Sequence, residues 1–239
     1  FNSWAMSIIR KVVRGRPFFK FHNVPSFVEE IKFSEEILNA LEGWVDRQKQ
    51  ALDVEVEEAF KKWPGQLKAW KKAESSAMLP RLKDFTHDIK GSNLPKLDKD
   101  KCLEFLKRKT FDMEDYVQDI YNLLANTSHL KNYLPANPKL DSNLDYLKRL
   151  TEKNQAKNNL DYFDMSLILR LIQLKNGGLP DGSGGVVLLD HLVIDEAQDF
   201  GPVEFAIMMS SVSDKRQITI VGDVAQKILS ARKFIGWNK

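Results

Sequence analysis

Two short apolar runs in the last quarter of the chain restrict the fold more than any other feature. Residues 186–194 and 218–221 are rich in Val, Leu and Ile, as is typical of strands that are covered on both faces in a parallel sheet. Between them, residues 203–212 have the length and composition of one helix, and Pro202 suits its first position. Strand, helix and strand within about 35 residues predict a βαβ unit with a right-handed crossover.

The first 176 residues instead show the three- and four-residue spacing of apolar side chains that is typical of helices. The clearest stripe lies in residues 34–63 and consists of Ile37, Leu38, Leu41, Trp44 and Val45. Pro64 and Gly65 follow and predict its end. Ser26 and Glu29 fit a capping box for a shorter helix before it. Further helices are predicted at residues 66–78, 81–90, 99–109 and 112–126.

Residues 161–176 form a helical segment of a different kind. They are apolar around most of the circumference, which predicts a helix buried on several sides, and Gly177 and Gly178 predict its end. The fold class expected from these patterns is α/β and predominantly helical. We expect a mainly helical domain over residues 1–160 and part of a parallel sheet within residues 161–239.

The composition is that of a compact protein in a reducing environment. The 239 residues include 14 Phe, 5 Trp and 5 Tyr, and the net charge is only +3, so disorder as the main state is excluded. Cys102 is the single cysteine, which excludes a disulfide within the chain. No apolar run approaches the roughly 18 residues of a membrane span, so we expect no membrane partner and a cytoplasmic location. The start at Phe1 rather than Met indicates a fragment or a trimmed product.

The N-terminal segment is basic. Residues 1–28 contain no acidic side chain. Five basic residues (Arg10, Lys11, Arg14, Arg16 and Lys20) lie there among aromatic residues that include Trp4, Phe18, Phe19 and Phe21. Such a segment could hold a nucleic-acid backbone and stack bases. The alternative, which ordinary surface composition favours, is an amphipathic helix with a solvated basic face and its aromatic residues in the core.

Acids and amides follow both predicted strands. Asp195 and Glu196 come directly after the first strand, and Gly222, Asp223 and Gln226 follow the second. Ligands bind at the carboxyl ends of parallel strands, so we expect these two clusters to converge on one crevice. Adjacent carboxylates repel each other, and burying them without a role would cost free energy. Both carboxylates would have a role if one held Mg²⁺ and the other polarised a water molecule beside a phosphate.

Both clusters resemble motifs of superfamily 1 helicases of the UvrD/Rep group. Residues 194–199 (Ile-Asp-Glu-Ala-Gln-Asp) resemble the DExQD form of the Walker B element, and residues 221–226 (Val-Gly-Asp-Val-Ala-Gln) resemble the motif that follows it after one helix. Residues 1–5 are similar to the region past the early Thr-Phe motif, and residues 160–164 to the segment before Walker B. Residues 199–205 and 221–226 also resemble the HelD-like branch, whose members remodel RNA polymerase.

The resemblance implies a role for each polar residue of the two motifs. Asp195 would hold Mg²⁺ through water, and Glu196, in the second shell of the metal, would orient and deprotonate the water that attacks the γ-phosphate of ATP. Gln226 would sense the γ-phosphate, while Gln198, Asp199 and Asp223 would connect the nucleotide site to the moving parts. The alternative is an acidic turn without chemistry, in which Asp199 caps the next helix.

The resemblance also implies which parts of a motor this chain contains. No G-x-x-x-x-G-K-[ST] sequence occurs, and the glycine-rich residues 181–185 lack the lysine and precede a strand, so they are predicted to be a connector. Residues 1–160 would be a helical 1B-like insertion, with residues 1–14 belonging to the RecA-like part. Residues 161–239 would be a partial RecA-like (P-loop NTPase) domain. Without phosphate-cradling amides and that lysine, this chain alone should not hydrolyse ATP, and the second motor domain, which would bring an arginine finger, is also absent.

One departure from the UvrD pattern concerns nucleic acid. Leu229 and Ala231 occupy the positions of two aromatic residues that stack on single-stranded DNA in that group. Phe234 and Trp237 could compensate, although core packing is the more common fate of aromatic residues. We therefore expect part of an ATP-dependent helicase or translocase that binds single-stranded or partly duplex DNA. The alternatives are a HelD-like factor that remodels RNA polymerase without unwinding, and a module that does not hydrolyse ATP.

Overall fold

The computed structural model describes residues 1–15, 17–20, 24–73 and 77–222, and this part of the chain is mostly helical with two small parallel sheets. The fold class predicted from the sequence is therefore correct. The helices are α1 (Asn2–Val12), α2 (Ser26–Lys32), α3 (Glu35–Phe60), α4 (Pro64–Lys72), α5 (Met78–Gly91), α6 (Lys96–Met113), α7 (Tyr116–Ala125), α8 (Thr127–Leu130), α9 (Leu140–Gln155), α10 (Asp164–Asn176) and α11 (Pro202–Met209). The strands are β1 (Phe18–Lys20), β2 (Asn159–Asp161), β3 (Leu192–Ile194) and β4 (Ile218–Ile220).

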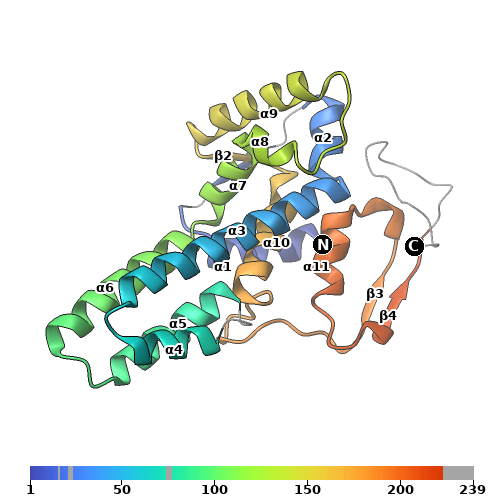
Figure 1. Cartoon of the computed structure of the whole chain (residues 1–239). Coiled ribbons are helices and arrows are strands. Elements are labelled where there is room, and N and C mark those ends of the chain that lie inside the picture. The colour runs from blue at the N-terminus through green and yellow to red at the C-terminus, as the bar shows by residue number, and fades with distance from the viewer. Residues whose placement is uncertain (16, 21–23, 74–76, 223–239) are drawn as a thin grey trace.

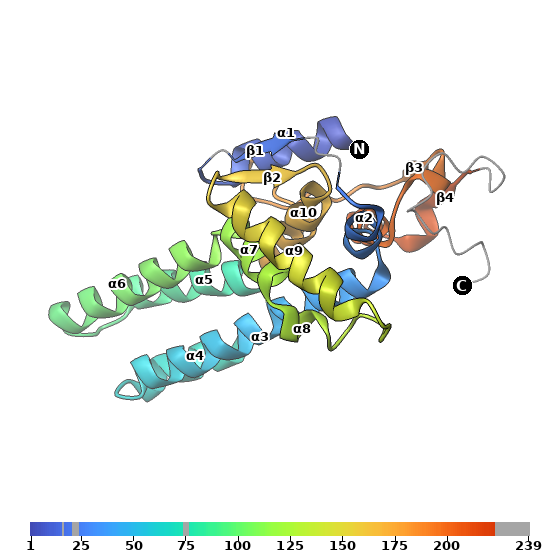
Figure 2. The ribbon, with the colours of Figure 1, turned by 90° about the horizontal axis from the view of Figure 1, so that it is seen from above.

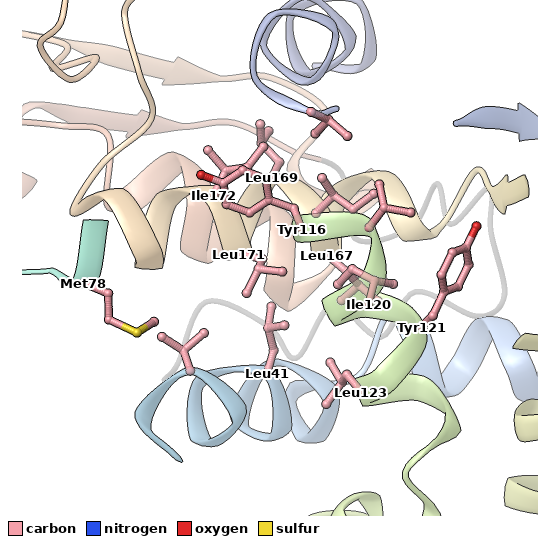
Figure 3. Packing of buried hydrophobic residues seen from close by; sticks show 14 of the residues in the cluster. Leu41, Met78, Tyr116, Ile120, Tyr121, Leu123, Leu167, Leu169, Leu171 and Ile172 are labelled. Carbon is pink, nitrogen blue, oxygen red and sulfur yellow. The ribbon is translucent and has the colours of Figure 1, made fainter. Parts of the chain in front are cut away.

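Helix α10 lies at the centre and packs against α1, α3, α5, α7 and α11 (Figure 1). Every residue from Asp164 to Gln173 is buried, as the apolar circumference predicted. Figure 3 shows Leu167 and Leu171 of α10 on the side that faces Leu41 of α3 and Ile120 of α7, with Leu169 and Ile172 on the other side of the helix. The helix ends where predicted, because Gly177 adopts a left-handed conformation (φ 74°) that a side chain would disfavour.

The long helix α3 extends with α4, α5 and α6 into an arm that projects from the rest of the fold (Figures 1 and 2). Ser34 caps α3 by accepting a hydrogen bond from the Ile37 amide at 3.1 Å. Within the arm, the Phe85 ring lies 4.9 Å from Phe60 and 5.3 Å from Trp70, so aromatic packing joins three of its helices. The stripe predicted for residues 34–63 supplies the core-facing side of α3.

Two local predictions in the helical part are wrong. The capping box of Ser26 and Glu29 is not formed, since α2 already begins at Ser26 and the residue at its N-cap is Pro25. The helix predicted over residues 66–78 ends at Lys72 as α4, and α5 begins at Met78, two residues before Pro80. A proline in the first turn of a helix costs no hydrogen bond, because amide groups there have no partner within the helix.

Strands β1 and β2 pair in parallel and join the start of the chain to residues near 160, with Phe18 opposite Asn159 and Lys20 opposite Asp161. The sequence did not predict these strands, because three residues are too few to show an alternating pattern. The Tyr121 hydroxyl on α7 donates a hydrogen bond to the Asn159 carbonyl at 2.7 Å and fixes β2 to the helical part. The two ends of the helical region are thereby held together.

Strands β3 and β4 pair in parallel with α11 between them in sequence, as the predicted βαβ unit requires. Helix α11 begins at Pro202, also as predicted. The first strand is shorter than expected, because residues 186–191 follow an irregular path that makes single bridges at Val186 and Leu189. The prediction of strands covered on both faces is wrong for the described residues. Val193 is 62% exposed, since β3 and β4 form a two-stranded sheet here with one face left uncovered.

A buried ionic cluster joins the end of α2 to the last residue of β2 and the first residue of α10. The Lys32 ammonium donates to the carboxylates of Asp161 and Asp164, and its nitrogen lies 2.6 Å from Asp164 Oδ1. All three side chains are buried. One ammonium faces two carboxylates, and burial together with the charge of Asp161 raises the pKa of Asp164 to about 7.

This cluster predicts a pH dependence of stability. The folded chain binds a proton at Asp164 more tightly than the unfolded chain does, so the free energy of unfolding should decrease as pH rises from the ordinary carboxyl pKa of 3.8 to about 7. Asp164→Asn should remove this contribution while keeping an oxygen for Lys32. Urea unfolding across this pH range measures the slope. The control Asp141→Asn alters an exposed carboxylate and should keep the wild-type slope. Equal slopes in both variants would contradict the assignment.

Candidate functional site

The turn after β3 presents the two adjacent carboxylates. Asp195 and Glu196 are both exposed, and Asp195 Oδ1 accepts a hydrogen bond from the Glu196 amide at 2.9 Å. Glu196 has a φ of 53°, in the left-handed region, which costs a residue other than glycine about 1 to 3 kcal/mol. The turn therefore directs both carboxylates outward at the carboxyl end of the strand, where the sequence placed them.

Gln198 lies directly behind Glu196. It belongs to the short 3₁₀ helix Ala197–Asp199, its side chain is buried, and its Nε2 donates a hydrogen bond to Glu196 Oε2 at 2.6 Å. A buried amide that holds an exposed carboxylate restricts the directions in which the carboxylate can point. The structure thus brings Gln198 and Glu196 together and gives Gln198 a positioning contact that the sequence did not predict.

The start of the second motif packs against this turn. The Val221 amide donates to the Ile194 carbonyl at 2.8 Å, and the Ala197 amide donates to the Val221 carbonyl at 3.0 Å. A Cβ atom on Gly222 would lie 2.7 Å from Gln198 Oε1 and 3.1 Å from the Ala197 nitrogen. A side chain at this position would require Gln198 to shift, so the start of the second motif is in close contact with the turn of the first. Asp223 and Gln226 lie outside the described residues.

Asp199 does not cap α11, so the alternative role considered for it is wrong. Glu204 occupies the third position of that helix, and its Oε2 accepts a hydrogen bond from the Gly201 amide at 2.6 Å. Its other oxygen accepts one from the Ser166 hydroxyl at 3.3 Å, which joins α11 to α10. A Glu at the third position of a helix is a known capping signal, and Glu204 carries that signal in the sequence. Asp199 Oδ1 is buried without a hydrogen-bond partner in the described part of the chain.

The start of the chain lies against the same sheet. Phe1, Trp4 and Phe200 line a pocket of about 270 Å³ that also contains Asp195, and the Phe1 and Phe200 rings are 6.0 Å apart. Apart from Asp195 and Ser211, the residues that line this pocket are apolar. This contact brings residues from opposite ends of the described chain to the Asp195 turn.

The side chains of the turn are suited to a hydrated cation and not to a complete metal site. Asp195 Oδ2 makes no protein hydrogen bond among those described, so it has lone pairs for a cation or a metal-bound water. The described residues contain no group of three or more His, Cys, Asp or Glu that could hold a metal ion. A magnesium ion here would take its remaining ligands from water and phosphate oxygens, as this ion does in many nucleotide sites.

In the glycine-rich loop at residues 181–185, the hydrogen-bond donors are directed at the carboxylate of Asp181 in the same loop. Asp181 accepts hydrogen bonds from the Ser183 amide at 2.7 Å, the Ser183 hydroxyl at 2.8 Å and the Gly185 amide at 3.0 Å. The Ser183 hydroxyl and the two amides lower the pKa of Asp181. These donors are occupied and cannot cradle a phosphate, so the loop has the geometry of a connector.

The basic N-terminal segment agrees in part with an amphipathic helix and in part with an exposed, nucleic-acid-binding segment. Ala5, Ile8 and Ile9 of α1 are buried, as expected for an amphipathic helix. Arg14 forms an ion pair with Glu114, and its guanidinium lies 4.1 Å from the Phe111 ring centroid. Phe18 is 68% exposed, in contrast to the core position expected for an aromatic residue of such a helix. Arg16 and Phe21 lie outside the described residues.

Comparison with known proteins gives a family. The family model of the UvrD/REP helicase N-terminal domain matches residues 30–233, which is most of the chain. No curated protein and no solved structure matches the chain significantly. In the described part of the chain, no helix has the length and apolar character needed to cross a membrane. The chain therefore belongs to the UvrD/REP helicase family, whose members are ATP-dependent helicases that bind nucleic acid.

Proposed function

We propose that this chain supplies the acidic half of an ATP hydrolysis site in a superfamily 1 helicase or translocase. The observation that carries the proposal is the Glu196 carboxylate, which is exposed at the end of β3, set by a left-handed turn and held by the buried Gln198. A carboxylate in an idle surface turn needs neither the backbone cost nor the buried amide. The left-handed turn and the hydrogen bond from Gln198 are expected for a carboxylate that must keep one orientation.

Asp195 is the proposed ligand for magnesium. Its position next to Glu196 places a cation and a base side by side, and its free oxygen can bind the cation directly or through water. When bound, Mg-ATP supplies the phosphoryl group and neutralises its developing charge. Asp195 itself orients the cation with respect to Glu196, since both carboxylates leave the same turn.

Glu196 is the proposed general base. Its exposed oxygens can accept a proton from a water molecule, while the hydrogen bond from Gln198 to Oε2 fixes the orientation of the carboxylate. Gln198 is thus a positioning residue in this proposal. Gly222, just after β4, packs closely against Gln198, so the end of β4 influences where Gln198 lies. Asp223 and Gln226 remain the predicted continuation of the site.

Single-stranded or partly duplex DNA is the proposed partner. The family to which the chain belongs and its two motifs support this proposal. A HelD-like remodeller of RNA polymerase is the second candidate, and the observation that favours it is the presence of Leu229 and Ala231 where the UvrD group has stacking aromatics. These two residues lie outside the described part of the chain. The two candidates share the same ATP hydrolysis site and differ in the partner on which the protein acts, DNA or RNA polymerase.

Glu196→Gln tests the assignment of the base. The substituted amide keeps an oxygen for the hydrogen bond from Gln198 but cannot take a proton, so ATP hydrolysis by the full-length protein should fall about a hundredfold or more. Binding of a fluorescent ATP analogue should remain close to that of the wild type. The control Asp190→Asn removes an exposed carboxylate before the amino end of β3 and should leave turnover unchanged. Wild-type turnover of Glu196→Gln would refute the role.

Gly222→Ala tests the contact between the two motifs. The added methyl group would meet Gln198 Oε1 at 2.7 Å and the Ala197 backbone at 3.1 Å, so the Gln198 side chain that holds Glu196 must shift. We expect kcat for ATP hydrolysis to fall about tenfold to a hundredfold, since small displacements of catalytic groups are costly. The matched control is Gly91→Ala, where a Cβ atom meets nothing within 4 Å. Equal kcat values for both variants would show that the packing has no influence on hydrolysis.

The two candidate partners predict different results for the full-length protein. A helicase should unwind a partly duplex DNA in the presence of ATP, and Glu196→Gln should abolish the unwinding. A polymerase remodeller should instead be retained by immobilised RNA polymerase and should leave the duplex paired. ATP-dependent unwinding without polymerase retention would exclude the remodeller, and the reverse pattern would exclude the helicase.

A further inference from the structure

A pocket of about 280 Å³ is lined by residues of α9, of β1 and β2 and of the segments next to them. Figure 2 shows that these elements lie away from β3 and β4. Three lysines line the pocket: Lys20 at the end of β1, Lys153 in the last turn of α9 and Lys157 just beyond that helix. They approach the pocket from segments that are more than 130 residues apart in the chain. The β1–β2 pairing is what brings them together.

The lysines have no carboxylate to neutralise them among the described residues. None of the three forms a described ion pair, and the residues that line the pocket include no acid. Glu152, next to Lys153, instead faces Lys148 at 3.9 Å. Asp161 is paired with Lys20 in the strand register, but its carboxylate is buried and bound to Lys32. The pocket therefore carries uncompensated positive charge.

Two asparagines in largely buried positions set this pocket apart from an ordinary surface with solvated lysines. Asn154 is 7% exposed and Asn159 is 4% exposed, and both line the pocket. In the described part of the chain, neither side-chain amide has a hydrogen-bond partner, although the Asn159 backbone carbonyl accepts one from Tyr121. The side-chain amide atoms of both residues are not among the buried polar atoms that lack a partner. They therefore remain open to the pocket and can donate to an acceptor that enters it.

The chemistry of the lining selects the ligand. Three ammonium groups and two amide donors with no acid favour an anion, and a phosphate group can accept hydrogen bonds from several donors at once. The remaining wall is apolar and includes Tyr146, which is 38% exposed and packs edge-on against Phe27 at 5.5 Å. This ring offers an apolar surface beside the bound anion.

We propose that this pocket binds a phosphate group. The group could belong to a free nucleotide or polyphosphate, or to the backbone of a nucleic-acid strand. The proposal does not depend on ATP hydrolysis, because Asp195 and Glu196 take no part in it. Lys153 and Asn154 hold the anion from the end of α9, and Lys20 and Asn159 hold it from the paired strands.

Pyrophosphate binding to the full-length protein tests the site, with calorimetry as the measurement. Lys153→Gln removes one exposed charge, and Asn154→Asp replaces a donor with a carboxylate of the same shape. Each should weaken binding about tenfold, the size of one lost charge-assisted hydrogen bond. The matched control is Lys148→Gln, one or two turns earlier on α9 and outside the pocket. Circular dichroism verifies that each variant is folded.

The difference between the Lys153 and Lys148 variants is the readout, because a nucleotide site elsewhere in the protein would bind pyrophosphate equally in both. A weaker Lys153→Gln with an unchanged Lys148→Gln supports the pocket. Equal affinities, or equal losses in both variants, would overturn it. Since Glu196→Gln reports on hydrolysis alone, the two proposals can fail separately.

A second titration with a labelled oligothymidylate distinguishes the two sources of phosphate. For a strand, Lys153→Gln should weaken binding and lower the dependence of log K on log salt by about one, while pyrophosphate competes. For a free phosphate ligand, the pyrophosphate affinity depends on Lys153 and the oligothymidylate affinity does not. Either pattern supports a phosphate site, and independence of Lys153 in both titrations would overturn it.

Discussion

Burial of α10 on nearly all sides is the interaction on which the rest of the structure depends. Its neighbours α1, α3, α5, α7 and α11 come from both the helical part and the sheet part, so this single helix joins them. Its polar residues also join α10 to its neighbours: Arg170 binds Glu42 of α3 at 2.6 Å, and Lys175 binds Asp119 of α7. Burial and the loss of hydration lower the pKa of Lys175, with Asp119 opposing the effect. Removing either partner would leave a buried charge unpaired, which is costly.

The position of the acidic turn follows from α10 through α11. Gln173 donates a hydrogen bond to the Ile207 carbonyl at 3.0 Å, and Ser166 donates to Glu204, whose other oxygen caps α11. Helix α11 connects the turn after β3 to β4, and parallel pairing sets the ends of these strands side by side. A rigid path of packed and hydrogen-bonded residues therefore links the helical core to Glu196. Such a support allows a side chain on an exposed turn to keep one direction.

The candidate site was predictable in its residue types but not in its internal contacts. Acids at the ends of two short apolar runs, one helix apart, were sufficient to place Asp195, Glu196 and Gly222 near one another, because parallel strands end at the same edge. The hydrogen bond from Gln198 to Glu196 and the fit of Gly222 over Gln198 depend on distances within a turn of unusual backbone conformation. No spacing rule contains that information.

The sequence by itself determined the helical majority, the βαβ unit, the central position of α10 and the family motifs, because periodicity and short-range signals are local. Only the tertiary structure decided that Lys32 would meet Asp161 and Asp164, that β1 would pair with β2, and that three lysines and two asparagines would share a pocket. It also decided that Val193 would be exposed. These contacts join residues far apart in the chain, and their partners are selected by the packing of whole helices rather than by any neighbouring sequence.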